Sequence, residues 1–332
     1  MDVSVVIPVC NEVENLPRLY ERLIAALATT GRHFELLFVD DGSRDGSTEL
    51  LRRLAETDRR VHVLVLRRNF GQTAAMHAGL QNAAGDYVVT IDADLQNDPA
   101  DIPAMLDKLD EGCDLVHGWR KDRHDRWLDR KLPSLIANRL ISWTTRFPIH
   151  DLGCTLKAMR REIAQELELY GEMHRFIPIL AHARGARCHE MVVSHHPRQF
   201  GQTKYGISRT LRVLLDLVTV KYLLDYFASP MKLFGRIGLA CCGAATLAAT
   251  SAAAMKLVHG TDITGNPLTL LAILSSVAAI QFFSLGLLGE VSARIYYANQ
   301  TKQAYAIREL INFQPANVRG DASDTATHRR AA

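Results

Sequence analysis

The first 120 residues alternate short, β-branched apolar runs with longer helical patterns, and this alternation constrains the fold more than any other feature. The apolar runs predict strands at 3–9, 34–39, 61–66, 87–92 and 114–118. The patterns between them predict helices at 15–30, 47–57, 72–84 and 101–111. Such alternation indicates an α/β fold with a mostly parallel sheet. Ligands of these sheets bind outside the carboxyl ends of the strands.

Polar clusters stand at the carboxyl ends of three predicted strands, and we expect them to meet at one edge of the sheet. The clusters are Asn11-Glu12, Asp40-Asp41-Gly42-Ser43 and Asp92-Ala93-Asp94. Two adjacent carboxylates, as in Asp40-Asp41, repel each other unless hydrogen bonds to a base or ribose, or a bound cation, relieve the repulsion.

Asp92 and Asp94 lie on a tight turn directly after an apolar strand. Hard cations such as Mg²⁺ and Mn²⁺ take oxygen ligands, usually one or two carboxylates plus phosphate oxygens, and such an ion neutralises a diphosphate leaving group. Aspartates are also common in surface turns and helix caps, so the triplet alone leaves that interpretation open.

Two long uncharged stretches run from Ile237 to Met255 and from Ile263 to Gly289. Because about 20 apolar residues cross a hydrocarbon core, we expect membrane spans at about 236–257 and 266–289. Buried core helices are the alternative, although soluble helices seldom run so far without a charge. Basic residues flank the outer ends of the stretches, so the positive-inside rule predicts a hairpin with both ends in the cytoplasm.

Composition excludes several other classes of protein. The net charge of +3 is too mild a basic excess to indicate nucleic acid binding. The six cysteines form no CxxC pair, so neither a zinc site nor a disulfide framework is indicated. No basic leader precedes the first strand, so a signal peptide is not expected and the first domain should start in the cytoplasm.

Two further segments have the pattern of helices that lie at a membrane surface. Residues 133–147 place apolar side chains at helical spacing with arginines nearby, although a helix of the domain core would show the same pattern. Residues 208–231 form an amphipathic segment that leads into the first span. The chain is thus expected to comprise a catalytic domain at 1–207, this juxtamembrane helix, two spans within 232–290, and a cytoplasmic segment at 291–332 that is disordered after about 314.

Ordered motifs in the first half of the chain resemble those of family 2 glycosyltransferases. They are Val5 to Glu12, Asp40-Asp41-Gly42-Ser43, Arg68-Asn69-Phe70-Gly71-Gln72, Gly85-Asp86 and Asp92-Ala93-Asp94-Leu95-Gln96. Later motifs resemble the polyprenyl-phosphate branch of that family, which includes dolichyl-phosphate mannosyltransferase and bacterial relatives. They are Asp151-Leu152-Gly153-Cys154, His174-Arg175-Phe176-Ile177-Pro178 and Arg198 to Tyr205. The resemblance extends over residues 3 to 312.

The resemblance implies an inverting, metal-dependent transferase with a GT-A type, Rossmann-like domain. It implies a nucleotide-sugar pocket lined by Pro8, Asn11, Glu12, Asp40, Asp41, Asp92 and Gln96. It implies that Mg²⁺ or Mn²⁺ lies among Asp92, Asp94 and Gln96. The acceptor phosphate would meet Arg175, Arg198, Lys204 and Tyr205, with Gly201 in the same motif. Arginine offers a planar fork and lysine a point charge to phosphate oxygens, which agrees with these roles.

The resemblance also implies the reaction and its location. The donor is expected to be a UDP-linked sugar and the acceptor undecaprenyl phosphate, with catalysis at the cytoplasmic membrane by Asp94, Asp151, Arg198 and Lys204. A phosphate monoester is mostly ionised at pH 7, so it needs no strong general base. We therefore expect Asp151 to orient a sugar hydroxyl or a basic side chain.

Three other classes of protein share some of these features. A processive polysaccharide synthase shares the early motifs, but this chain has Arg123-His124-Asp125-Arg126-Trp127 where such enzymes carry Gln-x-x-Arg-Trp. A catalytically silent membrane scaffold would not need intact Asp92 and Asp94. An oxidoreductase is disfavoured because no GxGxxG follows the first strand.

Two features of the later sequence bear on metal binding and assembly. The histidines at 182, 189, 195 and 196 match no familiar metal-ligand spacing. Gly235, Gly238 and Gly243 in the first span would allow close helix packing, and hence a dimer or tetramer.

Overall fold

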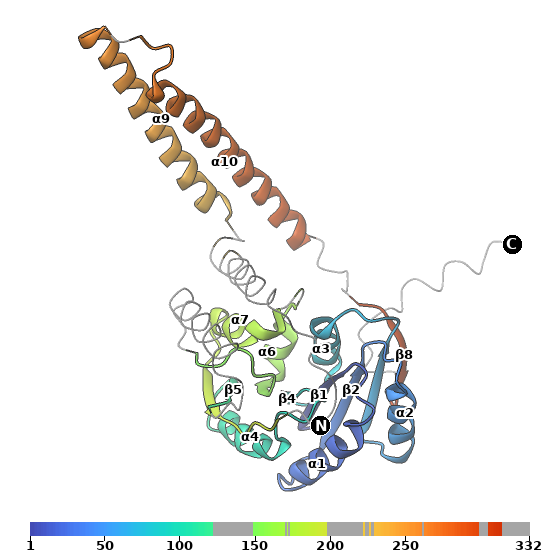
Figure 1. Ribbon diagram of the computed structural model, residues 1–332. Helices are drawn as coiled ribbons and strands as arrows, with labels where there is room; N and C mark the ends of the chain where they lie inside the picture. The colour runs from blue at the N-terminus through green and yellow to red at the C-terminus, as the bar shows by residue number, and fades with distance from the viewer. Residues whose placement is uncertain are drawn as a thin grey trace, which may run out of the picture. The chain divides into compact units, whose positions relative to one another are not determined.

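The computed structural model describes residues 1–121, 149–169, 171, 173–197, 222, 226, 229–260, 262–298 and 305–313. The chain divides into two compact units, one formed by Met1–Leu214 with Gln303–Ala332 and the other by Leu215–Lys302 (Figure 1). The predicted helix at 133–147, most of the predicted helix at 208–231, and the tail after 314 lie outside the described residues.

Within the described residues, one eight-stranded sheet organises the first unit, with strand order β7-β5-β6-β4-β1-β2-β3-β8. The strands are β1 Val3–Val9, β2 Phe34–Asp40, β3 Val61–Leu66, β4 Tyr87–Thr90, β5 Leu115–Trp119, β6 Lys157–Arg160, β7 Cys188–Val192 and β8 Ile307–Ile311. Pairs β1/β2, β1/β4, β2/β3 and β5/β7 are parallel, whereas β4/β6, β5/β6 and β3/β8 are antiparallel. The predicted α/β fold with a mostly parallel sheet is therefore confirmed.

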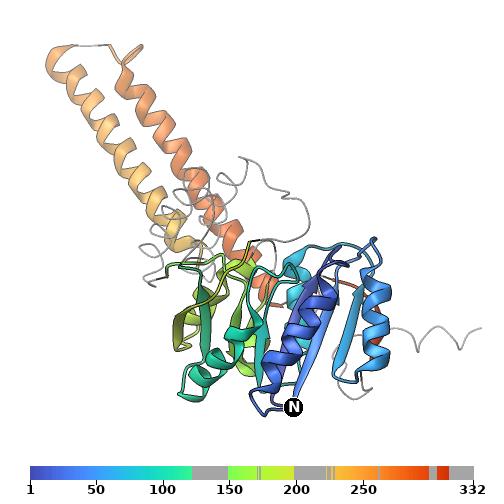
Figure 2. The same cartoon turned by 60° about the horizontal axis from the view of Figure 1, so that its bottom comes forward.

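Helices cover both faces of this sheet (Figures 1 and 2). The helical elements are α1 Leu16–Ala28, α2 Ser47–Thr57, α3 Gln72–Asn82, η1 Pro99–Asp101, α4 Ile102–Asp110, α6 Arg161–Glu166, η3 Met173–Phe176 and α7 Ile177–Ala183. Helices α1, α2 and α4 bury leucines, isoleucine and methionine against the odd-numbered valines of β1. Because side chains alternate across a strand, the even-numbered residues of β1 face α3 on the other side.

Helix α3 approaches the sheet more closely than an ordinary side chain would allow. A Cβ added to Gly79 would lie 2.2 Å from Cγ1 of Val6 and 3.2 Å from Cγ2 of Val39. Glycine at this position lets the backbone of α3 pack directly against side chains of β1 and β2. The close packing fixes the first residue of the helix, Gln72, at the carboxyl edge of the sheet.

The C-terminal segment contributes a strand that the sequence analysis did not assign. Strand β8 pairs antiparallel with β3, and the N–H of Arg67 donates to the carbonyl oxygen of Ala306 at 3.0 Å. Asn312 ends β8 in the left-handed region with φ of 64°, and its Nδ2 donates to the carbonyl oxygen of Ala55 at 2.6 Å. The edge of the sheet at β3 is thus covered by chain that follows the second long apolar helix.

The second unit contains α9 Met231–His259 and α10 Pro267–Ala298, two long apolar helices packed as a hairpin. By length and composition both could cross a membrane, and only 22% of the most apolar window of α9 and 11% of that of α10 is buried. Core helices of a soluble protein would be mostly buried, so this exposure favours membrane spans. A Cβ added to Gly238 would lie 3.1 Å from the ring of Phe283, so this glycine serves packing inside the hairpin. At Gly243 no atom of the residues that the structure describes lies within 4 Å of such a Cβ.

The pH dependence of stability offers a test of the contact between β5 and β7. Arg187 donates to the Asp114 carboxylate from its backbone N–H (2.9 Å), Nε (2.9 Å) and Nη2 (3.0 Å) at the start of both strands. These hydrogen bonds lower the pKa of Asp114 to about 2. Because the folded pKa lies below the unfolded value near 3.9, the stabilisation is full above about pH 5 and is lost as the pH falls through the folded pKa.

Asp114→Asn should therefore lower the free energy of unfolding by roughly 1 kcal/mol at pH 7, a value reduced from the full pKa shift because Arg187 is solvent-exposed. The difference from wild type should stay constant from pH 7 to pH 5 and shrink towards about pH 2. Thermal unfolding of the two proteins across this range measures it. A difference that grew at low pH would contradict the pairing.

Candidate functional site

The loop after β1 is hydrogen-bonded to the loop after β2. The N–H of Asn11, a residue with φ of 57°, donates to Oγ of Ser43 at 3.0 Å, and the N–H of Arg44 donates to Oδ1 of Asn11 at 2.8 Å. The N–H of Glu12 donates to Oγ of Ser47 at 3.1 Å. Three of the expected nucleotide residues, the half-buried Pro8 and Glu12 and the exposed Asn11, thus lie together at the carboxyl edge of the sheet.

The buried carboxylates of Asp40 and Asp41 receive hydrogen bonds from the chain itself. Asp40 accepts from the N–H of Ser43 at 3.0 Å and from the Thr48 hydroxyl. Asp41 accepts from the N–H of Phe70 at 2.6 Å and of Gly71 at 2.9 Å. Burial raises the pKa of Asp41, and the two backbone N–H groups oppose that rise. Asp41 therefore shapes the loop that precedes α3, and hydrogen bonds from the chain itself offset part of the repulsion expected between the two aspartates.

The turn after β4 presents Asp92 and Asp94 at the same edge. Nε2 of Gln72 donates to Oδ1 of Asp92 at 2.7 Å, so the first residue of α3 orients this carboxylate. Leu95 has φ of 59°, and the N–H of Gln96 donates to Oδ1 of Asp94 at 3.1 Å. Burial and the neighbouring charge of Asp94 raise the pKa of Asp92 to about 6. A cation at this turn would relieve that electrostatic cost.

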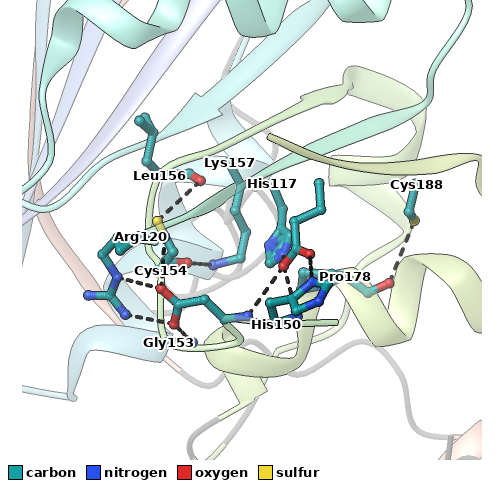
Figure 3. A network of polar contacts seen from close by, with 11 residues as sticks. His117, Arg120, His150, Gly153, Cys154, Leu156, Lys157, Pro178 and Cys188 are labelled. Carbon is teal, nitrogen blue, oxygen red and sulfur yellow. Dashed lines mark hydrogen bonds and ion pairs between the residues drawn. The ribbon is translucent and has the colours of Figure 1, made fainter. Parts of the chain in front are cut away.

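A buried ion pair joins Asp151 to Arg120 (Figure 3). Nε of Arg120 donates to Oδ2 of Asp151 at 2.7 Å and Nη2 donates to Oδ1 at 3.0 Å, while the N–H of Gly153 donates to Oδ1 at 3.1 Å. Burial alone would lower the pKa of Arg120, but its bonds to Asp151 hold that pKa above its usual value. Asp151 thus holds a basic side chain at the carboxyl end of β5.

Lys157 is a second buried cation at this edge. It is the first residue of β6, it is 1% exposed, and its Nζ donates to the carbonyl oxygen of Cys154. Burial lowers the pKa of Lys157 to about 8, whereas nearby Cys154 and Asp92 favour its charged form. Neither Arg120 nor Lys157 is among the site residues predicted from the sequence. The position of Arg120, two residues after the predicted strand 114–118, was the available signal.

Helix η3 approaches the same edge through His174. Nδ1 of His174 lies 2.6 Å from Oγ1 of Thr73, the residue that follows Gln72 in α3. Burial and the charge of Arg175 lower the pKa of His174 to about 3, so its ring is neutral at physiological pH. Arg175 itself is half-buried beside it.

The segment after β7 lies along the Asp94–Gln96 turn. The N–H of His196 donates to the carbonyl oxygen of Gln96 at 2.8 Å, and Nε2 of His196 lies 2.8 Å from Oδ2 of Asp98. The expected phosphate-binding residues Arg198, Gly201, Lys204 and Tyr205 follow at once in sequence but lie outside the described residues. The described part of the chain contains no group of three or more His, Cys, Asp or Glu side chains that could hold a metal ion.

Comparisons with known proteins agree with this arrangement. Residues 4–168 match the model of the family described as glycosyl transferase family 2. The chain is 40% identical over 318 residues to dodecaprenyl-phosphate galacturonate synthase of Rhizobium johnstonii, covering 95% of this chain and 94% of that one. It is 38% identical over 317 residues to undecaprenyl-phosphate 4-deoxy-4-formamido-L-arabinose transferase of Pseudomonas aeruginosa, covering 95% and 91%.

A solved structure shares the fold. Glucosyl-3-phosphoglycerate synthase of Mycobacterium tuberculosis, in complex with Mn²⁺ and UDP-glucose, superposes with a TM-score of 0.52 at 19% identity, covering 66% of this chain and 78% of that one. The first unit thus has the fold of a GT-A type domain. With full-length relatives at 38–40% identity, the chain belongs to glycosyl transferase family 2, and within it resembles the transferases that act on polyprenyl phosphates.

The Asp151–Arg120 pair should show the energetics of a buried ion pair. Removing one partner leaves the other charge buried and uncompensated, so Asp151→Ala should lower the free energy of unfolding by about 3–5 kcal/mol. The double variant Asp151→Ala/Arg120→Met removes both charges and should be less destabilised than the single variant. Thermal unfolding in detergent measures both, and a double variant that unfolds at a lower temperature than Asp151→Ala would contradict the pairing.

Proposed function

We propose that this chain transfers a sugar from a nucleotide-sugar to a polyprenyl phosphate at the cytoplasmic face of a membrane. The observation that carries the proposal is that similarity to two polyprenyl-phosphate sugar transferases spans 95% of the chain, the apolar hairpin included. A lipid acceptor requires a membrane-bound enzyme, and the two exposed apolar helices supply the attachment. The basic flanks of the hairpin support cytoplasmic placement of both termini.

The donor would bind across the carboxyl edge of the sheet. The loops after β1 and β2, with Pro8, Asn11, Glu12 and Asp40, are proposed to hold the nucleotide, while Asp41 shapes the neighbouring loop. The names of the relatives concern a uronic acid and a formamido-pentose, so we propose a UDP-linked sugar of this modified kind as donor.

A divalent cation fits the turn after β4. Asp92 and Asp94 offer carboxylate oxygens and Gln96 an amide oxygen as metal ligands. Oxygen ligands suit Mg²⁺ or Mn²⁺. Two carboxylates are too few for a closed site, so phosphate oxygens would complete the coordination. When bound, the cation would neutralise the charge that develops on the diphosphate leaving group. The chain's own contribution is to orient the carboxylates through Gln72 and the N–H of Gln96.

The acceptor phosphate would meet positive charge on the other side of that turn. Arg120 is fixed there by Asp151, and Arg175 follows His174, whose ring contacts Thr73 of α3. Arg198, Lys204 and Tyr205 follow His196, which is hydrogen-bonded to Gln96 and Asp98. The donor diphosphate and the acceptor phosphate are both anions and repel each other. We propose that these basic groups neutralise that charge and orient the two substrates.

Transfer of radiolabelled sugar to undecaprenyl phosphate tests the proposal directly. The full chain in detergent is assayed with a panel of UDP- and GDP-sugars and with Mg²⁺, Mn²⁺ or chelator. One donor should give labelled lipid, and Asp94→Ala should reduce the rate by at least ~100-fold because charge stabilisation is lost. Nucleotide binding without lipid product from any donor would overturn the proposal in favour of a polysaccharide acceptor or a silent scaffold.

Two isosteric variants separate orientation from proton transfer. Loss of a general base typically costs about 100- to 10,000-fold in rate, whereas an already ionised acceptor needs none. Asp151→Asn should therefore lose less than about 100-fold and remain faster than Asp94→Asn. The kcat of both is measured after their folding has been checked by thermal unfolding. Equal inactivity of the two folded variants would show that Asp151 does more than orient Arg120 or a sugar hydroxyl.

A further inference from the structure

Glu190, in the middle of β7, gathers four hydrogen-bond donors around one carboxylate. Its Oε1 accepts from the N–H of His150 at 2.9 Å and the N–H of Asp151 at 3.3 Å, and lies 2.9 Å from Nε2 of His117. Its Oε2 lies 2.5 Å from Nδ1 of His150. The side chain is 16% exposed. A carboxylate with this many directed partners fixes the backbone that donates to it.

The two histidines that contact Glu190 are held towards its carboxylate in different ways. His117 is paired with Glu190 in the register of β5 and β7, and burial followed by the charge of Lys157 lowers its pKa to about 3. Within the described residues Nδ1 of His117 has no partner, so the proton is assigned to Nε2, which donates to Glu190. His150 is 60% exposed and stacks on Trp119 with ring centroids 4.3 Å apart, which holds its Nδ1 towards the carboxylate.

These contacts converge on the residue that holds Arg120. Glu190 fixes the N–H of Asp151, and the Asp151 carboxylate then makes the bidentate pair with Arg120. His117, Arg120 and His150 lie around this network in Figure 3. No hydrogen bond links Glu190 directly to Asp92, Asp94 or Arg120 among the residues that the structure describes. Its influence on the reaction would pass through Asp151.

We propose that Glu190 is a positioning residue for the Asp151–Arg120 pair, an inference that rests on the proposed function. It holds the loop 149–153 so that the guanidinium of Arg120 points to the place where phosphate charge is neutralised. The role depends on hydrogen-bond geometry, since the four donors are directed at particular oxygens. Glutamine can keep this geometry: its Oε1 accepts the same three donors, and its Nε2 donates to Nδ1 of the other tautomer of His150.

Steady-state kinetics of Glu190→Ala and Glu190→Gln test the proposal. A misplaced charge-stabilising group slows the chemical step, so Glu190→Ala should lose about 10- to 100-fold in kcat, and no more than Asp151→Asn loses, because its effect passes through Asp151. Its KM for the donor should stay within about threefold of wild type, because the nucleotide is held by the loops after β1 and β2. Glu190→Gln should recover most of the rate.

Asp114→Ala is the matched control, because Asp114 ties the same two strands together at their amino-terminal ends and lies outside the site. It should lower thermal stability without changing kcat. Equal losses of kcat in Asp114→Ala and Glu190→Ala, or no recovery in Glu190→Gln, would reduce Glu190 to a general stabiliser of β7 and overturn the proposal.

A double-mutant cycle tests whether the effect passes through Asp151. Asp151→Asn/Glu190→Ala should be no slower than the slower single variant, because residues that act in one chain are not additive. Fully additive losses would overturn the proposal. If wild-type protein made no lipid product with any donor, the proposed function would fail by itself. A structure of full-length Glu190→Ala would then decide the inference, since an unchanged Asp151–Arg120 pair would refute it.

Discussion

Negative charge buried at the carboxyl edge of the sheet is the constraint on which the rest of the site depends. Among the described residues, aspartates 40, 41, 92, 94 and 151 lie there, and the side chains of all but Asp92 are buried. An isolated carboxylate is costly to bury, and anionic substrates add to the charge. The chain must therefore supply compensating donors and cations at each position, and the way in which it does so differs along the edge.

On the β1–β2 side the compensation comes from the backbone and hydroxyl groups. Asp40 and Asp41 accept from neighbouring loops, so their charge is used to shape those loops. On the β5–β6 side the compensation comes from cationic side chains, because Arg120 pairs with Asp151 and Lys157 lies near Asp92. Backbone N–H and hydroxyl dipoles suit the recognition of a nucleotide. The charge that develops on phosphate groups during transfer is stabilised better by cationic side chains. Between the two sides, the partly exposed Asp92 is the carboxylate for which a bound cation would do most.

The sequence allowed prediction of the elements that have strong local signals. The β-branched runs of β1 to β5 are buried on both faces and read clearly as strands, and the polar ends of three of them marked the edge where the site lies. Strands β6, β7 and β8 have four or five residues of mixed polarity, and only tertiary pairing makes them strands. The partners Arg120 and Asp151 are 31 positions apart, and His150 and Glu190 are 40 apart, so no spacing rule joins them.

Strand β8 belongs to the sheet but follows the hairpin in the chain. The chain leaves the first unit before α9 and returns to it after α10, so the hairpin is tied to the sheet at both of its ends. An uncovered β3 would present a row of unpaired backbone groups, which proteins avoid at sheet edges. The pairing also reaches Arg67, at the start of the loop whose Phe70 and Gly71 donate to Asp41. That loop leads into α3 and thus to Gln72, which orients Asp92. The segment after the hairpin therefore completes the support of the carboxylate turn, and a chain that ended after α10 would have both a bare edge and a less constrained site.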